Sequence, residues 1–233
     1  MESKYEDDFS NEQRLAKWLD EYFYRKINLN EYDISTKFIS ERPIKWGTER
    51  ERVAQKQGID IVYKIKTNEV LLVDEKAQLN YINRPLPTFA FEVLYKRQND
   101  KNEYAEGWFV NDDLKTTHYL LIYPYSDKVR HQYEITDYRQ FSEVELVLVE
   151  KNALKQKLES VGVNSDMVKE KAADMIEYDT KRVVFDIKDD RQAYLIKTQN
   201  LAEEPVNIVV RKYILDDIAV ARWRVTREKI EEI

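Results

Sequence analysis

The chain has no cysteine among its 233 residues. This absence excludes disulfide bonds, thiolate metal ligands and cysteine nucleophiles, and it suits a reducing compartment. No segment approaches the roughly 18 consecutive apolar residues of a membrane-spanning helix, and the first residues, MESKYEDDFSNEQ, are acidic rather than apolar. We therefore expect a cytoplasmic protein with no signal peptide and no membrane partner.

Glycine and proline are also scarce, with four and five residues respectively. So few turn-forming residues indicate long helices and strands joined by few tight turns. A hydrophobic content of 42% is enough for a sizeable core. Charged residues make up 35% of the chain, but their signs alternate, which argues against long disordered segments.

An excess of positive charge is lacking as well. The formal net charge is −6, with 38 basic and 44 acidic residues. Proteins that coat nucleic acid non-specifically carry charge of the opposite sign. The charge therefore counts against a pure DNA-binding module. It counts less against an enzyme, because bound metal ions bring positive charge to an active site.

Apolar periodicity predicts a helix near the N-terminus. Apolar residues recur at spacings of three and four between residues 15 and 22. Ser10 and Gln13 form a capping-box pair at the start of this pattern, and the pattern ends near Ile27. We expect an amphipathic helix between these limits.

Apolar and β-branched runs predict strands over most of the remaining chain. The predicted strands are residues 33–39, 59–65, 70–78, 88–95, 118–125, 144–151, 182–188, 193–198 and 205–215, with 218–230 left open. Two helices are predicted between them, one over 151–163 that ends near Gly162, and one through Ile176 that is capped by Asn164 or Ser165.

These elements predict an α/β (α+β) fold, in which helices flank a mixed central β-sheet. The length fits one domain, or one domain with an appendage. We expect residues 1–150 to form the core and residues 151–233 to form a C-terminal α/β subregion packed on it, unless the whole chain is a single domain. Partner contacts, homodimerisation and substrate positioning are all open as roles for the C-terminal subregion.

The strands at 59–65 and 70–78 flank the tripeptide Lys66-Thr67-Asn68 and predict a hairpin. A three-residue loop places Asp60 opposite Asp74 and puts Lys76 on the same face of the sheet. A two-residue turn shifts the pairing by one residue and sends Asp60 to the other face. The sequence leaves both registers open.

The first register would create a site with definite chemistry. Two adjacent carboxylates repel each other unless a cation lies between them. Oxygen ligands suit a hard ion such as Mg²⁺ or Mn²⁺, which polarises a phosphodiester and generates hydroxide from bound water. Lys76 would orient that water or stabilise charge on the phosphate.

The arrangement of Asp60 and the following Asp74-Glu75-Lys76 resembles the D…(D/E)-x-K signature of the PD-(D/E)XK nuclease superfamily. Ile59 stands where the full signature has proline. The resemblance implies a restriction-endonuclease-like fold over about residues 10–125, with one helix and a mixed four-stranded core sheet. It also implies metal ligation by Asp60, Asp74 and the Glu75 carbonyl, and metal-dependent hydrolysis of nucleic acid, with DNA as the expected substrate.

Members of this superfamily often add a glutamate from the first helix. Glu12 is the first choice for that ligand, because it precedes Leu15 and Leu19 on the apolar stripe and is predicted to point inward. Glu21 and Glu51 are the alternatives.

Three further residues are predicted to contact the substrate. Gln78 follows Lys76 by two and is expected on the same face. Arg52 and Lys56 belong to a basic stretch just before Asp60 and are expected to hold phosphates. The alternative for these two is an ordinary solvated helix face.

Two other functions stay open. In the first, the chain is a catalytically inactive protein on the nuclease fold that binds nucleic acid or protein. In the second, it is an unrelated α+β protein in which Asp60, Asp74 and Lys76 occur together by accident. Asp60 and Asp74 on opposite sheet faces would indicate the latter.

Overall fold

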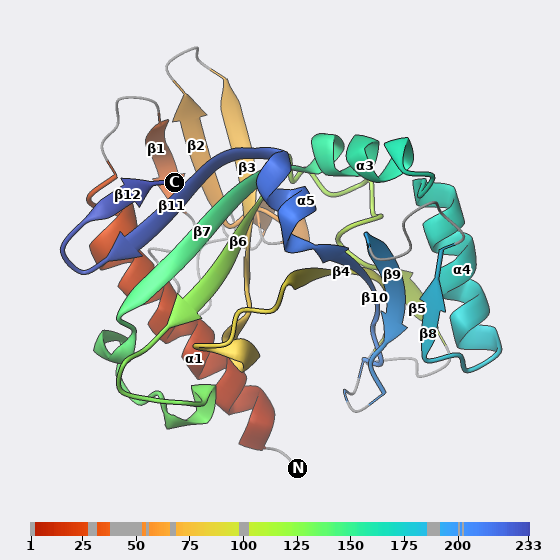
Figure 1. Ribbon diagram of the computed structural model, residues 1–233, viewed down its shortest axis with the longest axis horizontal. Helices are drawn as coiled ribbons and strands as arrows, with labels where there is room; N and C mark the ends of the chain where they lie inside the picture. The colour runs from red at the N-terminus through yellow and green to blue at the C-terminus, as the bar shows by residue number, and fades with distance from the viewer. Residues whose placement is uncertain are drawn as a thin grey trace. The chain divides into compact units, whose positions relative to one another are not determined.

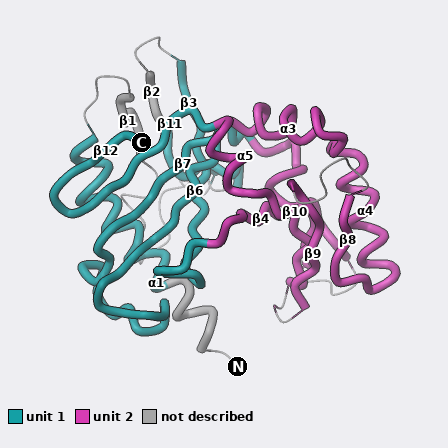
Figure 2. Tube along the Cα trace, in the orientation of Figure 1, with its two compact units in different colours: residues 1–85, 115–149, 219–233 teal, residues 86–114, 150–218 magenta. Residues whose placement is uncertain are grey.

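The computed structural model describes residues 3–27, 32–37, 53–54, 56–65, 69–97, 103–185, 192–199, 201 and 203–233. These form two compact units, which Figure 2 shows in different colours. Unit 1 comprises residues 1–85, 115–149 and 219–233, and unit 2 comprises 86–114 and 150–218. The predicted division at residue 150 coincides with one passage between the units. Residues 86–114, which were expected in the core, belong to unit 2. Residues 219–233, which were expected in the C-terminal subregion, belong to unit 1.

Unit 1 is built on a seven-stranded sheet with the strand order β1-β2-β3-β6-β7-β11-β12. Its strands are β1 (Tyr32–Lys37), β2 (Ile61–Ile65), β3 (Val70–Ala77), β6 (His118–Tyr125), β7 (Glu143–Glu150), β11 (Ala219–Thr226) and β12 (Ile230–Glu232). The sheet is mixed, because β3 and β6 run parallel whereas β2 and β3 run antiparallel. Every residue of β6 except its last is buried, which confirms the predicted central strand.

One face of this sheet is covered by α1 (Ser3–Leu19) and the π-helical turn η1 (Asp20–Tyr24), as Figure 1 shows. Trp18 is fully buried in the shared core, and its indole N–H donates a hydrogen bond to the Phe141 carbonyl at 3.0 Å. Leu71 and Val73 of β3 belong to the same core. Because side chains alternate along a strand, Asp74 lies on the opposite face of β3.

The helix starts earlier than predicted. Ser10 lies inside α1 rather than at its N-cap, so the predicted capping box is wrong. Neither glycine nor proline occurs before Pro43, and nothing in this stretch therefore stops the helix from extending back to Ser3.

Unit 2 holds a five-stranded antiparallel sheet with the order β5-β4-β10-β9-β8. Its strands are β4 (Thr88–Lys96), β5 (Tyr104–Glu106), β8 (Arg182–Val184), β9 (Ala193–Lys197) and β10 (Val206–Arg211), and its helices are α3 (Lys151–Ser160), α4 (Ser165–Glu177) and α5 (Lys212–Asp217). Helix α4 contacts β4, β8, β9 and β10. Its buried side chains are Val168, Ala172 and Met175.

Two predictions for this region need correction. The strand at 88–95 was assigned to the core with the Asp60 hairpin, but β4 pairs with β5 and β10 in the other sheet. The strand predicted over 205–215 ends at Arg211, and α5 follows it. An ion pair between Lys212 and Asp216, at the helical spacing of four residues, favours the helix at that point.

The remaining predicted elements are close to the structure. The segment left open at 218–230 forms most of the β11–β12 hairpin. The ends of the predicted strands at 33–39 and 182–188 lie outside the described residues. No helix among the described residues is long and apolar enough to cross a membrane.

Of the two caps predicted for α4, Asn164 is the one in the structure, because its side chain accepts a hydrogen bond from the Met167 backbone N–H at 2.8 Å. We predict that Asn164→Ala lowers the free energy of unfolding by about 1 kcal/mol, since a helix N–H loses its acceptor. Urea denaturation would measure the change. Asn164→Asp keeps an acceptor and should unfold like the parent protein, and equal losses in both variants would contradict the capping role.

Candidate functional site

The β2–β3 hairpin has the register that brings Asp60 and Asp74 together. Ile61 pairs with Val73 and Val62 with Leu72, so the next position places Asp60 opposite Asp74. The Asp60 N–H adds a 2.8 Å hydrogen bond to the Val73 carbonyl, next to the pair of Ile61 and Val73. The first predicted register is therefore confirmed and the one-residue shift is wrong, although residues 66–68 of the loop lie outside the described residues.

The Asp60 side chain is held by the neighbouring strand. Its Oδ2 accepts a hydrogen bond from the Glu75 backbone N–H at 2.9 Å. Gly58 precedes it with a φ of 69°, a left-handed conformation that favours glycine. The Thr116 hydroxyl donates to the Gly58 carbonyl at 2.5 Å. Two hydrogen bonds, one from the Glu75 N–H and one from the Thr116 hydroxyl, thus hold the segment of Asp60 beside β3.

Asp74 is the buried member of the site, with 4% of its surface exposed. The Lys76 ammonium lies 2.8 Å from its Oδ1, and the Lys76 side chain is 30% exposed. Burial raises the pKa of Asp74 to about 8. Lys76 opposes this rise, whereas the charge of Asp60 and a hydrogen bond with its carboxyl group add to it. Although the distance is that of an ion pair, burial outweighs Lys76 and keeps the carboxyl protonated at neutral pH.

Glu75 points the other way. Its Oε1 accepts a hydrogen bond from the Tyr24 hydroxyl, which comes from the π-helical turn on the covered face of the sheet. Only backbone atoms of Glu75 are thus close to Asp60. The Glu75 carboxylate is therefore separated from the pair formed by Asp60 and Asp74. The role of the Glu75 carbonyl as a metal ligand stays a prediction.

Glu12 does not point inward as predicted, because its side chain is exposed. The buried polar residue at this level of α1 is Asn11, whose amide donates to the Gln132 carbonyl at 3.0 Å. Asn11, Leu15 and Trp18 follow each other at spacings of four and three and define the inward stripe. Glu12 lies about 100° around the helix from Asn11 and so leaves this stripe.

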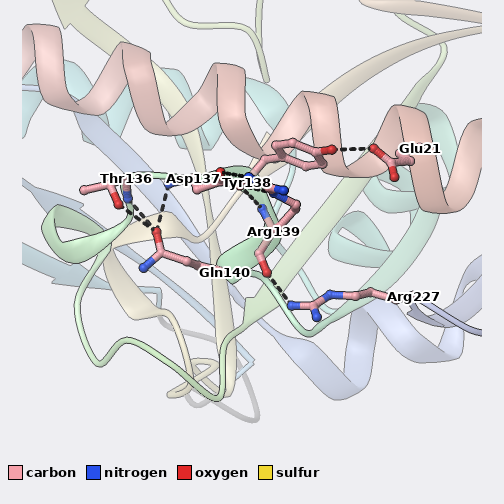
Figure 3. A network of polar contacts seen from close by, with 7 residues as sticks. All are labelled: Glu21, Thr136, Asp137, Tyr138, Arg139, Gln140 and Arg227. Carbon is pink, nitrogen blue, oxygen red and sulfur yellow. Dashed lines mark hydrogen bonds and ion pairs between the residues drawn. The ribbon is translucent and has the colours of Figure 1, made fainter.

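Glu21, the second choice, belongs to a different network, shown in Figure 3. Its Oε2 accepts a 2.7 Å hydrogen bond from the Tyr138 hydroxyl, and this bond lowers the pKa of Glu21. Next to Tyr138, Asp137 and Arg139 form an ion pair, which holds the pKa of Asp137 well below its usual range. The Arg227 guanidinium donates to the carbonyls of Arg139 and Phe141.

The network joins three parts of unit 1. It connects η1, which follows α1, to η4 (Tyr138–Gln140) and to the turn between β11 and β12. Glu21 is thereby committed to holding these segments together rather than to the Asp60 site. Glu51, the third choice, lies outside the described residues.

The predicted substrate-binding residues have different outcomes. Lys56 is exposed, and Arg52 lies outside the described residues. Gln78 is half-buried and follows the last residue of β3, so strand alternation no longer fixes the direction of its side chain. Its contact with the Lys76 face stays a prediction.

The contacts made by Tyr24 and Thr116 were not anticipated from the sequence. Both join segments far apart in the chain, to Glu75 and to Gly58 respectively. No local motif marks either residue, because neither stands in a recognisable spacing with its partner. Only the folded sheet brings these pairs together.

The site offers two carboxylates to a cation. Among the described residues, no group of three or more histidine, cysteine, aspartate and glutamate side chains is arranged to hold a metal ion. Asp60 and Asp74 nevertheless suit a hard divalent ion, because such an ion would replace the proton that keeps the buried pair from repelling. Water and substrate oxygens complete the shell of magnesium in many proteins that supply only one or two carboxylates.

No family model matches the chain, and neither a curated protein nor a solved structure matches it. The assignment of chemistry to this site therefore depends on the geometry of Asp60, Asp74 and Lys76.

The raised pKa of Asp74 predicts how stability depends on pH. Between about pH 4 and pH 8 the folded protein holds a proton that the unfolded chain has released, so the free energy of unfolding falls as the pH rises through this range. Asp74→Asn removes this dependence. We predict that the variant gains stability relative to the parent between pH 5 and pH 8, by up to about 1.4 kcal/mol per pH unit.

Urea denaturation in the presence of a chelator would measure this gain. Asp112→Asn is the matched control, because an ion pair with Lys155 lowers the pKa of Asp112 and leaves it ionised in both states over the same range. A stability difference between Asp74→Asn and the parent that stays constant with pH would contradict the assignment.

Proposed function

We propose that the protein is a Mg²⁺- or Mn²⁺-dependent nuclease of the PD-(D/E)XK type, which hydrolyses phosphodiester bonds of nucleic acid, with DNA as the expected substrate. The observation that carries the proposal is the meeting of Asp60 and Asp74 across the hairpin, with the Lys76 ammonium 2.8 Å from Asp74. An amine beside two carboxylates on one face of adjacent strands is the geometry that the signature requires.

The fold of unit 1 supports the proposal. Strands β2, β3, β6 and β7 are neighbours in one mixed sheet, and α1 covers one face of it. A helix on one face of a mixed sheet supports a core of this type, with β7 in the sheet in place of the strand expected at 88–95. The candidate residues lie on β3 and just before β2, at the open end of the hairpin.

Asp60 and Asp74 would hold the metal ion. When bound, the ion would supply Lewis-acid activation of the phosphodiester and of a water molecule. Asp74 contributes a carboxyl group that burial disfavours as a free anion, so it would exchange its proton for the ion. Asp60 contributes a carboxyl group whose direction is fixed by the Glu75 N–H.

Lys76 would act on the reacting atoms. Its side chain follows Asp74 by two residues on the same face of β3 and is partly exposed, so it reaches solvent beside the buried carboxyl. From this position its ammonium would orient the attacking water or stabilise negative charge on the phosphate in the transition state.

One observation favours the alternative of an inactive protein on the same fold. Glu12 is exposed, and within the described part of the chain no third carboxylate joins Asp60 and Asp74. A nuclease that has lost a ligand would keep the fold and a nucleic-acid or protein partner without hydrolysis.

Cleavage of supercoiled plasmid with Mn²⁺ or Mg²⁺ tests the proposed reaction. We predict that the parent protein nicks or linearises the plasmid, that a chelator stops it, and that Lys76→Ala lowers the rate by about 10²–10³-fold, because the transition state loses a charged donor. Lys157→Ala removes a lysine from the partly exposed pair with Asp217 and should cut at the parent rate. Lys76→Ala cutting at the parent rate would refute the role of Lys76.

Calorimetric titration with Mn²⁺ separates the active from the inactive form. We predict binding to the parent protein and its loss in both Asp60→Asn and Asp74→Asn, because a hard cation needs charged oxygen ligands here. Binding that survives in both variants would place the ion elsewhere. No binding to the parent up to millimolar Mn²⁺, with or without DNA, would favour the inactive protein.

A further inference from the structure

Two tyrosines are exposed beyond the ends of β3 and β6. Tyr81 ends the short helix η2 (Leu79–Tyr81), which follows β3, and 46% of its surface is exposed. Tyr133 lies in η3 (Gln132–Glu134), which follows β6, and 53% of its surface is exposed. Among the described residues neither ring packs against another aromatic ring, and about half of each residue is open to solvent.

Side-chain hydrogen bonds fix the two tyrosine-bearing segments to each other. Asn83 donates to the Val129 carbonyl at 2.8 Å and accepts from the Ser126 N–H at 2.6 Å. Its φ of 61° turns the chain at the point where these bonds form. The Gln132 amide also donates to the Asn80 side chain, and η2 contacts η3. The exposed rings thus stand on a rigid support.

Three cations accompany the tyrosines. Arg84, Lys128 and Arg130 are exposed, and within the described residues none of them forms an ion pair. The nearby carboxylates are Asp127 and Glu134, and Glu134 accepts the backbone N–H of Arg130 rather than a side chain. In a chain with a net charge of −6, this combination of unpaired cations and open aromatic rings favours a ligand with phosphates and flat rings.

The tyrosine patch, defined as Tyr81, Arg84, Lys128, Arg130 and Tyr133, is carried by segments that follow β3 and β6 in the chain. Strands β3 and β6 run parallel, so the segments that follow them leave the sheet at the same edge. Asp74 is three residues from the end of β3, a distance of about 10 Å along the strand. The first segment of the patch, η2, begins two residues beyond that end.

We propose that the tyrosine patch binds single-stranded nucleic acid, with bases stacked on Tyr81 and Tyr133 and phosphates held by Arg84, Lys128 and Arg130. A duplex hides the faces of its bases, whereas unpaired nucleotides offer them to aromatic rings. The inference deepens the proposed function and rests on it for the reaction: the substrate delivered to Asp60 and Asp74 is an unpaired segment or end rather than continuous duplex.

Fluorescence anisotropy with labelled oligothymidine tests the patch without requiring cleavage. With the full chain in a chelator, we expect tighter binding to the single strand than to a duplex of equal length. Tyr81→Ala and Tyr133→Ala should each weaken binding by about five- to a hundredfold, and the Tyr→Phe variants should bind like the parent protein. Arg84→Gln and Arg130→Gln should each reduce the salt dependence by about 0.7 in slope.

Tyr178→Ala is the matched control, because Tyr178 is 70% exposed and belongs to unit 2. Equal loss in Tyr178→Ala, equal affinity for duplex and single strand, or no binding of oligothymidine would overturn the patch. A surface that recognises a protein instead would produce the last of these results.

The patch and the proposed reaction fail in different ways. Tyrosine-dependent binding with no cleavage of plasmid or oligonucleotide by the parent protein would refute the nuclease and keep the patch. Metal-dependent cleavage that is unchanged by Tyr81→Ala and Tyr133→Ala, on single-stranded and duplex substrates alike, would keep the nuclease and refute the patch.

Discussion

The pairing of β2 with β3 is the constraint on which the candidate site depends. Side chains alternate along each strand, so the register alone decides whether Asp60 and Asp74 face each other or lie on opposite sides of the sheet. Two hydrogen bonds hold the chain in place just before β2 begins: the Asp60 N–H donates to the Val73 carbonyl, and the Glu75 N–H donates to the Asp60 carboxyl group. Leu71 and Val73 point from β3 into the core that α1 covers. A shift of β3 by one residue would turn these apolar side chains to the other face of the sheet.

This register creates an electrostatic cost that the local structure only partly offsets. Asp74 is buried beside a second carboxyl, and Lys76 does not compensate for the loss of water. Such an arrangement weakens the fold at neutral pH unless a cation or a proton is present. Stability and the proposed cation binding would therefore be linked in this site.

The sequence predicted the local features well because they depend on neighbours in the chain. The central strand at 118–125 and the hairpin of the strands at 59–65 and 70–78 follow from short patterns. The register of Asp60 against Asp74 and the choice between Asn164 and Ser165 as the cap were left open by the sequence. The direction of Glu12 was mispredicted, because the stripe it was placed on is centred on Asn11 and Trp18, and only packing against the sheet reveals that centre. The placement of β4 failed for a related reason: its partner β10 lies more than a hundred residues away, and strand pairing at that separation has no local signature.

The two units are interleaved along the chain, which passes between them at 85/86, 114/115, 149/150 and 218/219. Neither unit is therefore a continuous piece of the polypeptide, and no single cut in the gene isolates one of them. A fragment that stops at residue 150 would lack β11, the strand that pairs with β7 along its whole length. Such a fragment would expose the unpaired backbone of a hydrophobic strand, which is a surface prone to aggregation. The last fifteen residues thus complete a sheet whose first strands are encoded near the other end of the chain.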